Sequence, residues 1–328
     1  MFCFKKKIIK NSLASQYETN LDNNHKHFLD INHFNAREID MLVDFSIYLK
    51  NNRNRCNYSG AFKNKTLAMI FEKNSLRTRI SFDIGFAEMG GHTIYLNKND
   101  IHLGEKEAVS DTSKVISKMA HLVMIRCYKH KETLLDFAYN SSVPVINGLT
   151  DYSHPCQIIA ALSAFKNHFG KNYKTKTMLW LGAYNNVLLS YIQAAIALNI
   201  NFHISCPHEY GIPEDLKKEI QNYQNIKLFQ NSKEAAKNTD IIITDTWVSM
   251  NDNFKFDDIK NIFYPYQVNK EIMNIANSDA VFSHCLPAIR GQEVTADVID
   301  SKASIVFSEA EFRLHSQKAI MLYICNLI

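Results

Sequence analysis

Short apolar runs of strand length alternate with segments of helical periodicity along most of this 328-residue chain. Runs that are apolar throughout are typical of strands buried on both faces, and helices between them are the usual crossovers of a parallel sheet. The chain is also longer than one hydrophobic core usually allows. We therefore predict an α/β protein with two doubly wound parallel-sheet domains. The predicted strands are 66–71, 93–96, 122–126, 143–147, 178–182, 202–206, 226–229, 241–246, 280–286 and 304–307.

A long helix is predicted after Pro155, because proline is well tolerated at the first position of a helix. We expect this helix to join the two domains. We also expect a C-terminal helix, from about Phe312, to pack back on the first domain. The predicted divisions are an N-terminal tail at 1–26, a first domain at 27–155 together with 312–328, and a second domain at 156–311.

The composition limits the classes of partner. The net charge of +4 comes from 37 basic and 33 acidic residues, without a long basic block beyond the N-terminus, which argues against nucleic acid as the main partner. No apolar run approaches the ~20 residues that cross a bilayer. Seven scattered cysteines without a Cys-x-x-Cys pair indicate reduced thiols. We therefore expect a soluble, cytoplasmic protein with no nucleic-acid or membrane partner.

The first 26 residues contain three consecutive lysines but no arginine. Organellar presequences are usually rich in arginine, and the short apolar pair after the lysines is too brief for a secretory signal. A disordered tail is the favoured interpretation, with a transit peptide as the alternative.

The turn from Ser75 to Arg79 follows an apolar run and opens a predicted helix. Ser75 is a candidate N-cap, and a helix N-terminus offers free backbone N–H groups and a positive dipole end. The hydroxyl groups of Ser75 and Thr78 and the guanidinium groups of Arg77 and Arg79 surround this place. Arginine can hold a phosphoryl group through two parallel hydrogen bonds, so the turn suits a phosphate. The alternative is an ordinary capped helix with solvated arginines.

Polar residues at other predicted strand ends are further candidates, because ligands of parallel sheets bind at the carboxyl ends of the strands. Arg126 ends an apolar strand, where its charge would be costly without an anion or a salt-bridge partner. His154 precedes a helix whose dipole disfavours imidazolium, so we expect a neutral imidazole that donates to a carbonyl oxygen. Gln157, one turn later, is placed to bind an amide. The alternative for the last two is a simple helix cap.

Two acidic or nucleophilic candidates lie in the second half of the chain. Asp245 leaves an aliphatic strand and suits a substrate ammonium group, with a turn-forming aspartate as the alternative. His284 and Cys285 are adjacent, which suggests a thiol with its base. Neighbours along a strand point to opposite faces, however, so we do not expect these two to pair.

Cofactor and metal motifs are missing from the sequence. The segment from Trp180 to Asn186 stands where a dinucleotide fingerprint would stand, but it lacks G-x-G-x-x-G. The thirteen histidines show no metal-ligand spacing. We therefore predict neither a cofactor nor a metal.

Together, these motifs resemble those of the carbamoyltransferases, specifically the ornithine carbamoyltransferases, from about His27 to Ser316. The resemblance implies transfer of the carbamoyl group of carbamoyl phosphate to L-ornithine, which gives L-citrulline and phosphate. It also implies a homotrimer with active sites close to subunit boundaries, and no cofactor. The motifs that carry it are Phe71-Glu72-Lys73-x-Ser75-x-Arg77-Thr78-Arg79-x-Ser81-Phe82, Leu103-Gly104-x-Lys106-Glu107, Asp111-Thr112, Val143-Pro144-Val145-Ile146-Asn147-Gly148-Leu149, His154-Pro155-Cys156-Gln157, Asp245-x-Trp247-Val248-Ser249-Met250, Tyr266-Gln267-Val268-Asn269, His284-Cys285-Leu286-Pro287-Ala288 and Glu311-x-Arg313-x-His315.

By this resemblance the first domain would bind carbamoyl phosphate and the second would bind ornithine. The catalytic residues would be Arg126, His154, Asp245 and Cys285: the first two, with Thr78, would polarise the carbamoyl oxygen, and the last two would lie near the attacking amine. Carbamoyl phosphate would be bound by Ser75, Leu76, Arg77, Thr78, His102, Arg126, His154, Gln157, Cys285, Leu286 and Arg313, and ornithine by Asn186, Asp245, Ser249 and Met250.

Most departures from the usual pattern of this family fall on the acceptor side. Three hypotheses therefore stand: an active ornithine carbamoyltransferase, a non-catalytic paralogue that binds carbamoyl phosphate, and a carbamoyltransferase with another amine acceptor. An aspartate acceptor would call for extra basic residues and fits less well. The departures are Ala183, Tyr184, Leu189, Asn251 and Ile289 on the acceptor side, and Leu76 and His102 in the phosphate half.

Overall fold

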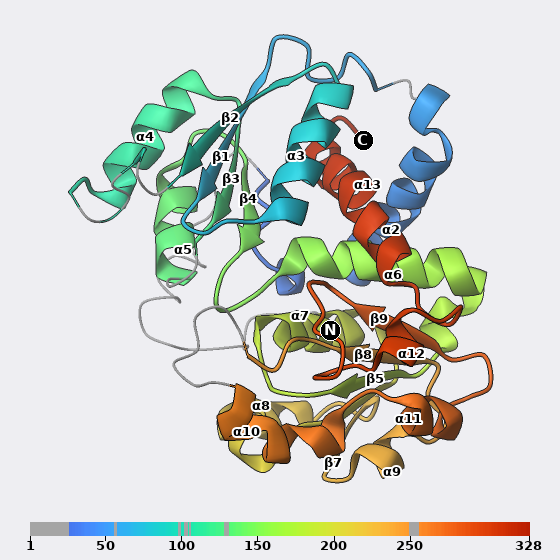
Figure 1. The fold of residues 1–328 in the computed structure, drawn as a ribbon. Coiled ribbons are helices and arrows are strands. Elements are labelled where there is room, and N and C mark those ends of the chain that lie inside the picture. The colour runs from blue at the N-terminus through green and yellow to red at the C-terminus, as the bar shows by residue number, and fades with distance from the viewer. Residues whose placement is uncertain are drawn as a thin grey trace. The chain divides into compact units, whose positions relative to one another are not determined.

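A computed structural model of the chain describes residues 26–55, 58–97, 100–101, 104, 106–127, 131–248 and 256–328 (Figure 1). The chain divides into two compact units, each with one parallel sheet, which confirms the predicted α/β fold class. The predicted first domain included 34–51, but these residues group with the second unit. The first unit comprises the described residues of Met1–His33, Asn52–Cys156 and Gln317–Ile328, and the second comprises Phe34–Asn51 and Gln157–Ser316.

The sheet of the first unit has the strand order β2-β1-β3-β4, and all its pairs are parallel. Each of these strands forms where an apolar run predicted one. The register places Phe71 opposite Arg126, so the carboxyl ends of the two central strands lie side by side. The strands are β1 (Thr66–Phe71), β2 (His92–Asn97), β3 (Leu122–Arg126) and β4 (Val145–Leu149).

Helices cover both faces of this sheet. Alternate residues of the strands, among them Ile70 and Ile125, pack with α4 and α5 in one cluster. Figure 1 shows α3 on the opposite face, where its side chains Phe82 and Phe86 are fully buried. Burial of both faces explains why the central strands are apolar at every position. The helices of this unit are α3 (Leu76–Glu88), α4 (Val109–Met119) and α5 (Lys131–Asn140), with the 3-10 turns η1 (Ile31–His33) and η2 (Arg53–Arg55).

The sheet of the second unit has the order β7-β6-β5-β8-β9 and is also parallel throughout. Leu179 and Leu181 face a cluster formed with α9, α11 and α12. Trp180, on the other face of the same strand, lies against Tyr191 of α7 with ring centroids 6.2 Å apart. The strands are β5 (Met178–Leu181), β6 (Phe202–Ser205), β7 (Ile226–Phe229), β8 (Ile241–Thr244) and β9 (Val281–His284).

The predicted connecting helix is α6 (Pro155–Phe169). It begins at Pro155, as expected, and continues from the last residues of the first unit into the second. The remaining elements of the second unit are helices and 3-10 turns. They are α2 (Ala36–Asn51), α7 (Asn186–Leu198), α8 (Glu214–Ile220), α9 (Ser232–Ala236), α10 (Phe256–Phe263), α11 (Lys270–Ile275), α12 (Ala296–Ile299), η3 (Gly170–Thr175), η4 (His208–Tyr210) and η5 (Tyr264–Tyr266).

The predicted strand at 304–307 is wrong. Ser304 forms a single isolated bridge with Phe282, and the helix α13 (Val306–Ile324) begins two residues later. The backbone N–H of Glu309 already donates to the carbonyl oxygen of Ile305. A short apolar run does not by itself distinguish a strand from the first turn of a helix, and this run belongs to the helix.

The end of α13 belongs to the first unit, which agrees with the predicted packing of the C-terminal helix. Lys318 is buried there, and its Nζ lies 2.9 Å from Glu88 Oε2. Arg53 contacts the same carboxylate at 2.5 Å. Burial opposes ionisation of Glu88, but these two cations hold its pKa below its ordinary value.

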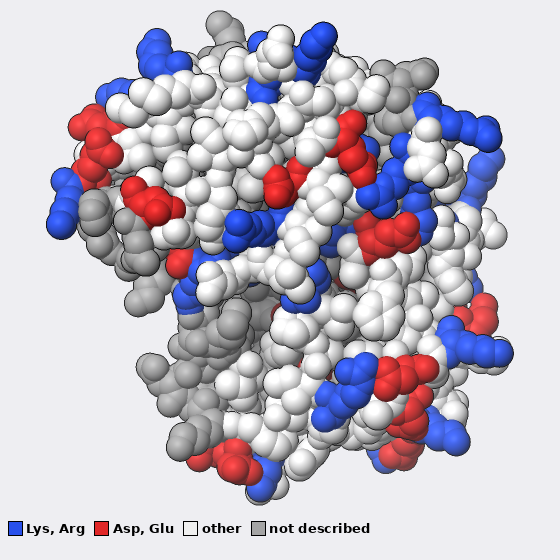
Figure 2. All heavy atoms as spheres, turned by 45° about the horizontal axis from the view of Figure 1, so that its top comes forward, with Lys and Arg blue, Asp and Glu red and all other residues white. Residues whose placement is uncertain are grey.

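Charged side chains of both signs are interspersed on the face that Figure 2 shows, without a continuous basic surface. This distribution agrees with the small net charge of the sequence. In the described part of the chain, no helix combines the length and the apolarity that a membrane crossing requires.

Candidate active site

The turn into α3 has the geometry expected of an anion site. Ser75 occupies the N-cap position with extended backbone angles, and its side chain makes no capping hydrogen bond among the described residues. Leu76 is the first helical residue, and 68% of its side chain is exposed. The first backbone N–H groups of a helix have no partner within the helix. Hydroxyl and backbone donors therefore meet at the positive end of the α3 dipole.

Arg126 and Thr78 come together at the carboxyl edge of the first sheet. The Arg126 Nη1 donates to Thr78 Oγ1 at 3.0 Å, and Thr78 is buried. The backbone N–H of Glu72 donates to the Arg126 carbonyl oxygen, which ties the turn after β1 to the end of β3. This contact places a guanidinium group over the first turn of α3, where Arg77 is half-buried.

The two arginines of the motif after Leu76 have different surroundings. The guanidinium group of Arg79 lies 3.9 Å from the centre of the Tyr95 ring. Arg79 is exposed and stacked on this aromatic face, in the first turn of α3. The difference follows from helical geometry, because positions 77 and 79 project about 200° apart around the helix axis. His102 lies outside the described residues.

His154 lies directly before α6 and is buried. The turn that precedes it is closed by side chains: the Ser153 backbone N–H donates to Thr150 Oγ1 at 3.1 Å, and Asn147 Nδ2 donates to Ser153 Oγ at 3.1 Å. The Cys156 thiol donates to the Asn147 carbonyl oxygen at 3.2 Å. These bonds fix the backbone on both sides of His154, at the same sheet edge as Arg126.

Asp245 is held at the carboxyl edge of the second sheet. Its Oδ2 accepts from Asn185 Nδ2 at 2.8 Å, and its Oδ1 accepts from the Cys285 thiol at 3.3 Å and from the Thr246 backbone N–H at 2.8 Å. The carboxylate therefore has a fixed orientation and also closes a turn, as in the alternative interpretation from the sequence. Its binding of a substrate ammonium group stays a prediction. Asn186 is the first residue of the neighbouring helix α7.

Asn185 is a strand-end candidate from the sequence to which we had assigned no role. Its Oδ1 accepts from the backbone N–H groups of Val187 and Leu188 as the N-cap of α7, while its amide nitrogen donates to Asp245. One side chain thus caps the start of α7 and also orients the Asp245 carboxylate. The pair Asn185-Asn186 after a buried strand was the available signal, but sequence alone does not show which asparagine faces which neighbour.

The turn after β9 presents a strained backbone. Leu286 has a φ of 58°, in the left-handed region that non-glycine residues rarely adopt. Its backbone N–H donates to His284 Nδ1 at 2.8 Å, and His284 Nε2 lies 3.3 Å from Glu293 Oε1, with both side chains fully buried. The Glu293 carboxylate also accepts from the Ile289 backbone N–H at 2.6 Å. A buried histidine and glutamate therefore hold the Leu286 backbone in place.

Our expectation that His284 and Cys285 point apart is wrong in one respect. One ligand atom each of Asp245, His284 and Cys285 lie within 4.8 Å of one another, because β9 ends at His284 and strand alternation does not extend to Cys285. The imidazole nevertheless faces the inside of the turn: Nδ1 accepts from the Leu286 backbone N–H, and Nε2 lies 3.3 Å from Glu293 Oε1 without a hydrogen bond. The imidazole is therefore not placed as a base for the thiol or as an open metal ligand.

Gln157 and Arg313 form a buried polar contact in the second unit. The Arg313 Nη1 donates to Gln157 Oε1 at 2.6 Å, and Gln157 Nε2 donates to Glu309 Oε1 at 2.5 Å. Glu309 also accepts from the Ser283 hydroxyl group. Glu309 and Ser283 were not among the predicted site residues, because neither carries a signal until the fold brings their positions together.

Three residues that depart from the usual acceptor-side pattern of the family make defined contacts or are buried in the second unit. The Ala183 carbonyl oxygen accepts from Trp180 Nε1 at 3.1 Å, the Tyr184 backbone N–H donates to the Tyr210 carbonyl oxygen at 2.8 Å, and Leu189 is buried. Three further residues of the predicted acceptor loop lie outside the described residues. They are Ser249, Met250 and Asn251.

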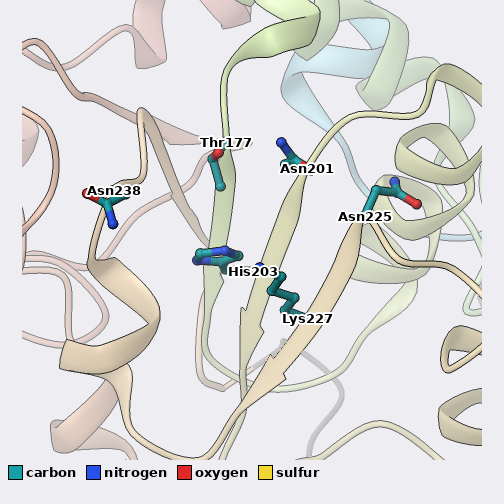
Figure 3. Close-up of a pocket in the computed structure, with 6 residues that line it drawn as sticks. All are labelled: Thr177, Asn201, His203, Asn225, Lys227 and Asn238. Carbon is teal, nitrogen blue, oxygen red and sulfur yellow. The ribbon is translucent and has the colours of Figure 1, made fainter.

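A cavity of about 230 Å³ opens at the other edge of the second sheet. Figure 3 shows its side chains around the amino ends of β5, β6 and β7. No predicted site residue lines it, and ligands of parallel sheets bind at the carboxyl edge. The cavity is lined by Thr177, Asn201, His203, Asn225, Lys227 and Asn238.

Comparison with known families matches both halves of the chain. The carbamoyl-P binding domain of aspartate/ornithine carbamoyltransferases matches residues 26–167, and the Asp/Orn binding domain matches residues 174–324. The chain therefore belongs to the aspartate/ornithine carbamoyltransferase family.

Individual relatives point to one branch of this family. An ornithine carbamoyltransferase of Hydrogenovibrio crunogenus is 44% identical over 91% of this chain and 98% of its own length. Among solved structures, an ornithine carbamoyltransferase from Pyrococcus furiosus is 36% identical, with a TM-score of 0.87 over 93% of this chain and 98% of its own. One from Burkholderia thailandensis is 39% identical, with a TM-score of 0.82 over 91% and 98%. The resemblance predicted from the motifs is confirmed.

The double role of Asn185 can be separated by substitution. Asn185→Asp keeps the helix cap but sets a carboxylate against Asp245, so we expect the free energy of unfolding to fall by about 1–2 kcal/mol at neutral pH. The loss should shrink at acidic pH, where the two carboxylates share a proton. Asn185→Ala removes the cap and should cost about 1 kcal/mol at both pH values. Urea denaturation at pH 7 and pH 4 measures both, and an Asp variant as stable as the original chain at pH 7 would exclude the contact.

Proposed function

We propose that this protein transfers the carbamoyl group of carbamoyl phosphate to the side-chain amine of L-ornithine, releasing L-citrulline and phosphate. The observation that carries the proposal is the fixed Asp245 carboxylate with the Cys285 thiol donating to it. A carboxylate suits an acceptor that bears an ammonium group and repels one that bears a second carboxylate, as aspartate does. The relatives named above, all ornithine carbamoyltransferases, support the same acceptor.

Carbamoyl phosphate is assigned to the first unit. Its phosphate would lie at the N-terminus of α3, where the Ser75 and Thr78 hydroxyl groups and the backbone N–H groups of the first turn can donate. Arg77 and Arg126 would supply the charge that a dianion requires. Arg313 is included on the motif alone. His102, from the predicted set, belongs to this proposal on the motif alone.

The carbamoyl carbonyl is assigned to Arg126, Thr78 and His154. As the amine attacks, negative charge develops on this oxygen, and hydrogen-bond donors held in advance stabilise that charge without reorganising. The Arg126 to Thr78 contact and the closed turn before His154 provide such preorganisation. The Gln157 side-chain oxygen and the Leu286 carbonyl oxygen would accept from the carbamoyl NH2.

The acceptor is assigned to Asn186 and Asp245, with Ser249 and Met250 included on the motif alone. The ornithine side-chain amine must lose a proton before its lone pair can attack the carbamoyl carbon. The new C–N bond then forms as the C–O bond to phosphate breaks, and phosphate leaves with the electron pair. Asp245 and Cys285 would hold the amine during this step. Carbamoyl transfer changes no oxidation state, so the reaction requires no redox cofactor.

Incubating the purified protein with carbamoyl phosphate and ornithine should produce citrulline and phosphate in equal amounts. Both products are measured in parallel, with reactions lacking either substrate as controls. If phosphate analogues bind but no citrulline forms above the control, the chain is a non-catalytic binding protein. If product forms only with putrescine or N-acetylornithine, the acceptor assignment is wrong while the carbamoyl transfer remains.

Arg77→Ala should raise the Kd for carbamoyl phosphate by about 100-fold or more, because a buried charge-assisted contact to phosphate is worth about 3 kcal/mol. Arg79→Ala is the matched control, since Arg79 stacks on Tyr95 and should leave the Kd nearly unchanged. Calorimetric titration measures both. Equal effects of the two substitutions would remove Arg77 from the site.

We also propose that the protein acts as a homotrimer. Leu76, Ile80 and Ile84 are spaced by four residues along α3, and each is more than 40% exposed, which makes an apolar stripe on the helix that begins at the proposed phosphate site. We expect light scattering to give the mass of three chains, and Ile80→Glu to shift the mass towards one. A monomer at micromolar concentration would contradict the trimer.

The same proposal places the protein in the cytoplasm. The described cysteines form no disulfide bond, and reducing conditions would keep them as thiols. Recovery of the chain in the cytosolic fraction of its own cells tests this location, and recovery in an organelle would favour a transit role for residues 1–26.

A further inference from the structure

Glu309 is a buried acid near two residues to which the proposed mechanism assigns carbamoyl phosphate. Only 1% of its surface is exposed. Its Oε1 accepts from Gln157 Nε2 at 2.5 Å, and its Oε2 accepts from the Ser283 hydroxyl group. One helical turn further along α13, Arg313 Nη1 donates to Gln157 Oε1 at 2.6 Å. The Gln157 amide is therefore held between an acid and a guanidinium group.

This arrangement permits only one orientation of the Gln157 amide. A guanidinium group can only donate, so it requires the amide oxygen on the Arg313 side. The Glu309 oxygen that faces Gln157 accepts, so it requires the amide nitrogen on the other side. Turning the amide by 180° would set donor against donor and acceptor against acceptor. The oxygen keeps a second lone pair, which is free to accept another hydrogen bond.

We propose that Glu309 is a positioning residue, which fixes the Gln157 amide so that its oxygen and not its nitrogen is offered to the NH2 of the carbamoyl group. The inference rests on the proposed function, because the carbamoyl ligand of Gln157 comes from it. Through Ser283, the same acid also fixes the middle of β9, whose last residue is His284.

The charge state of Glu309 is compatible with this role. Burial raises the pKa of Glu309 above its ordinary value, although the hydrogen bonds from Ser283 and Gln157 and the charges of His284 and Arg313 oppose the rise. Tyr191 of α7 faces the same group, and burial together with Glu309 raises the pKa of that phenol. If Glu309 carries a proton on Oε2, its Oε1 still accepts from Gln157, so the orientation is kept in both states.

A purely structural role is the alternative, since any buried acid that accepts two hydrogen bonds stabilises its surroundings. The two roles differ in which ligand they affect. Inorganic phosphate has no NH2 group, so it does not use the Gln157 oxygen. Loss of the amide orientation should therefore weaken carbamoyl phosphate and spare phosphate, whereas a general loss of structure should weaken both.

Glu309→Leu tests this directly, because the new side chain cannot accept from Gln157 Nε2, whereas the Glu309→Gln side chain still can through its amide oxygen. Without that acceptor the Gln157 amide is held on the Arg313 side alone, so we expect the Kd for carbamoyl phosphate to rise about tenfold in Glu309→Leu and to stay near its original value in Glu309→Gln, while the Kd for inorganic phosphate stays within about twofold in both. Glu311→Gln is the matched control: Glu311 lies on the same helix, is exposed, and pairs with Lys50 at 2.6 Å. Both constants should be unchanged in this control. Titration calorimetry gives the constants, and thermal unfolding verifies that each variant is folded.

Glu309→Asp provides a second variant in case the first does not fold. It keeps a carboxylate but withdraws the acceptor from Gln157 by one methylene, so the same selective loss is expected. Equal loss of both ligands, or no loss of either, would overturn the positioning role. If the unmodified protein binds no carbamoyl phosphate at all, the proposed function fails instead, and the two failures are distinguished by that single titration.

Discussion

Parallel pairing of the strands is the constraint on which the candidate site depends. In a parallel sheet all carboxyl ends meet at one edge, so residues far apart in the sequence become neighbours if each directly follows its strand. In the first unit this register sets Phe71 opposite Arg126 and allows Thr78 to receive a hydrogen bond from that arginine. In the second unit β5, β8 and β9 are neighbours, and Asn185, Asp245 and Cys285 follow them in that order. The Asp245 carboxylate therefore accepts hydrogen bonds from both other side chains. No side chain at these places could act without that alignment.

Polar groups near these edges are costly to bury, and the carboxylates of Asp245 and Glu309 are each satisfied by specific partners. Asp245 accepts three hydrogen bonds, and Glu309 accepts two while Gln157 connects it to Arg313. Buried polar networks contribute little net stability, because desolvation offsets most of the gain, but they define one arrangement when every member is paired. The geometry of the site is therefore determined by donor and acceptor matching, while apolar packing supplies most of the folding energy.

Much of this could be predicted from the sequence. β1, β3 and β7 form over the very residues of their apolar runs, and Ser75 occupies the predicted N-cap, because buried strands and helix starts have strong local signals. The local sequence pattern wrongly predicted a strand at 304–307, where an apolar run begins the helix α13. The roles of Asn185, Ser283 and Glu309 were not predicted for another reason: these roles depend on partners distant in sequence, and periodicity does not reveal such partners.

The division of the chain into units has a consequence for how the protein is made. The first unit needs residues 317–328, and the second needs residues 34–51, so neither unit is a continuous stretch of the chain. A ribosome that has released only the first half of the polypeptide has therefore supplied a four-stranded sheet without its C-terminal partner, in which Lys318 has yet to reach Glu88. The first unit can complete its packing only after residues 317–328 have been synthesised. Until then its uncovered apolar surface is available to chaperones or to other nascent chains.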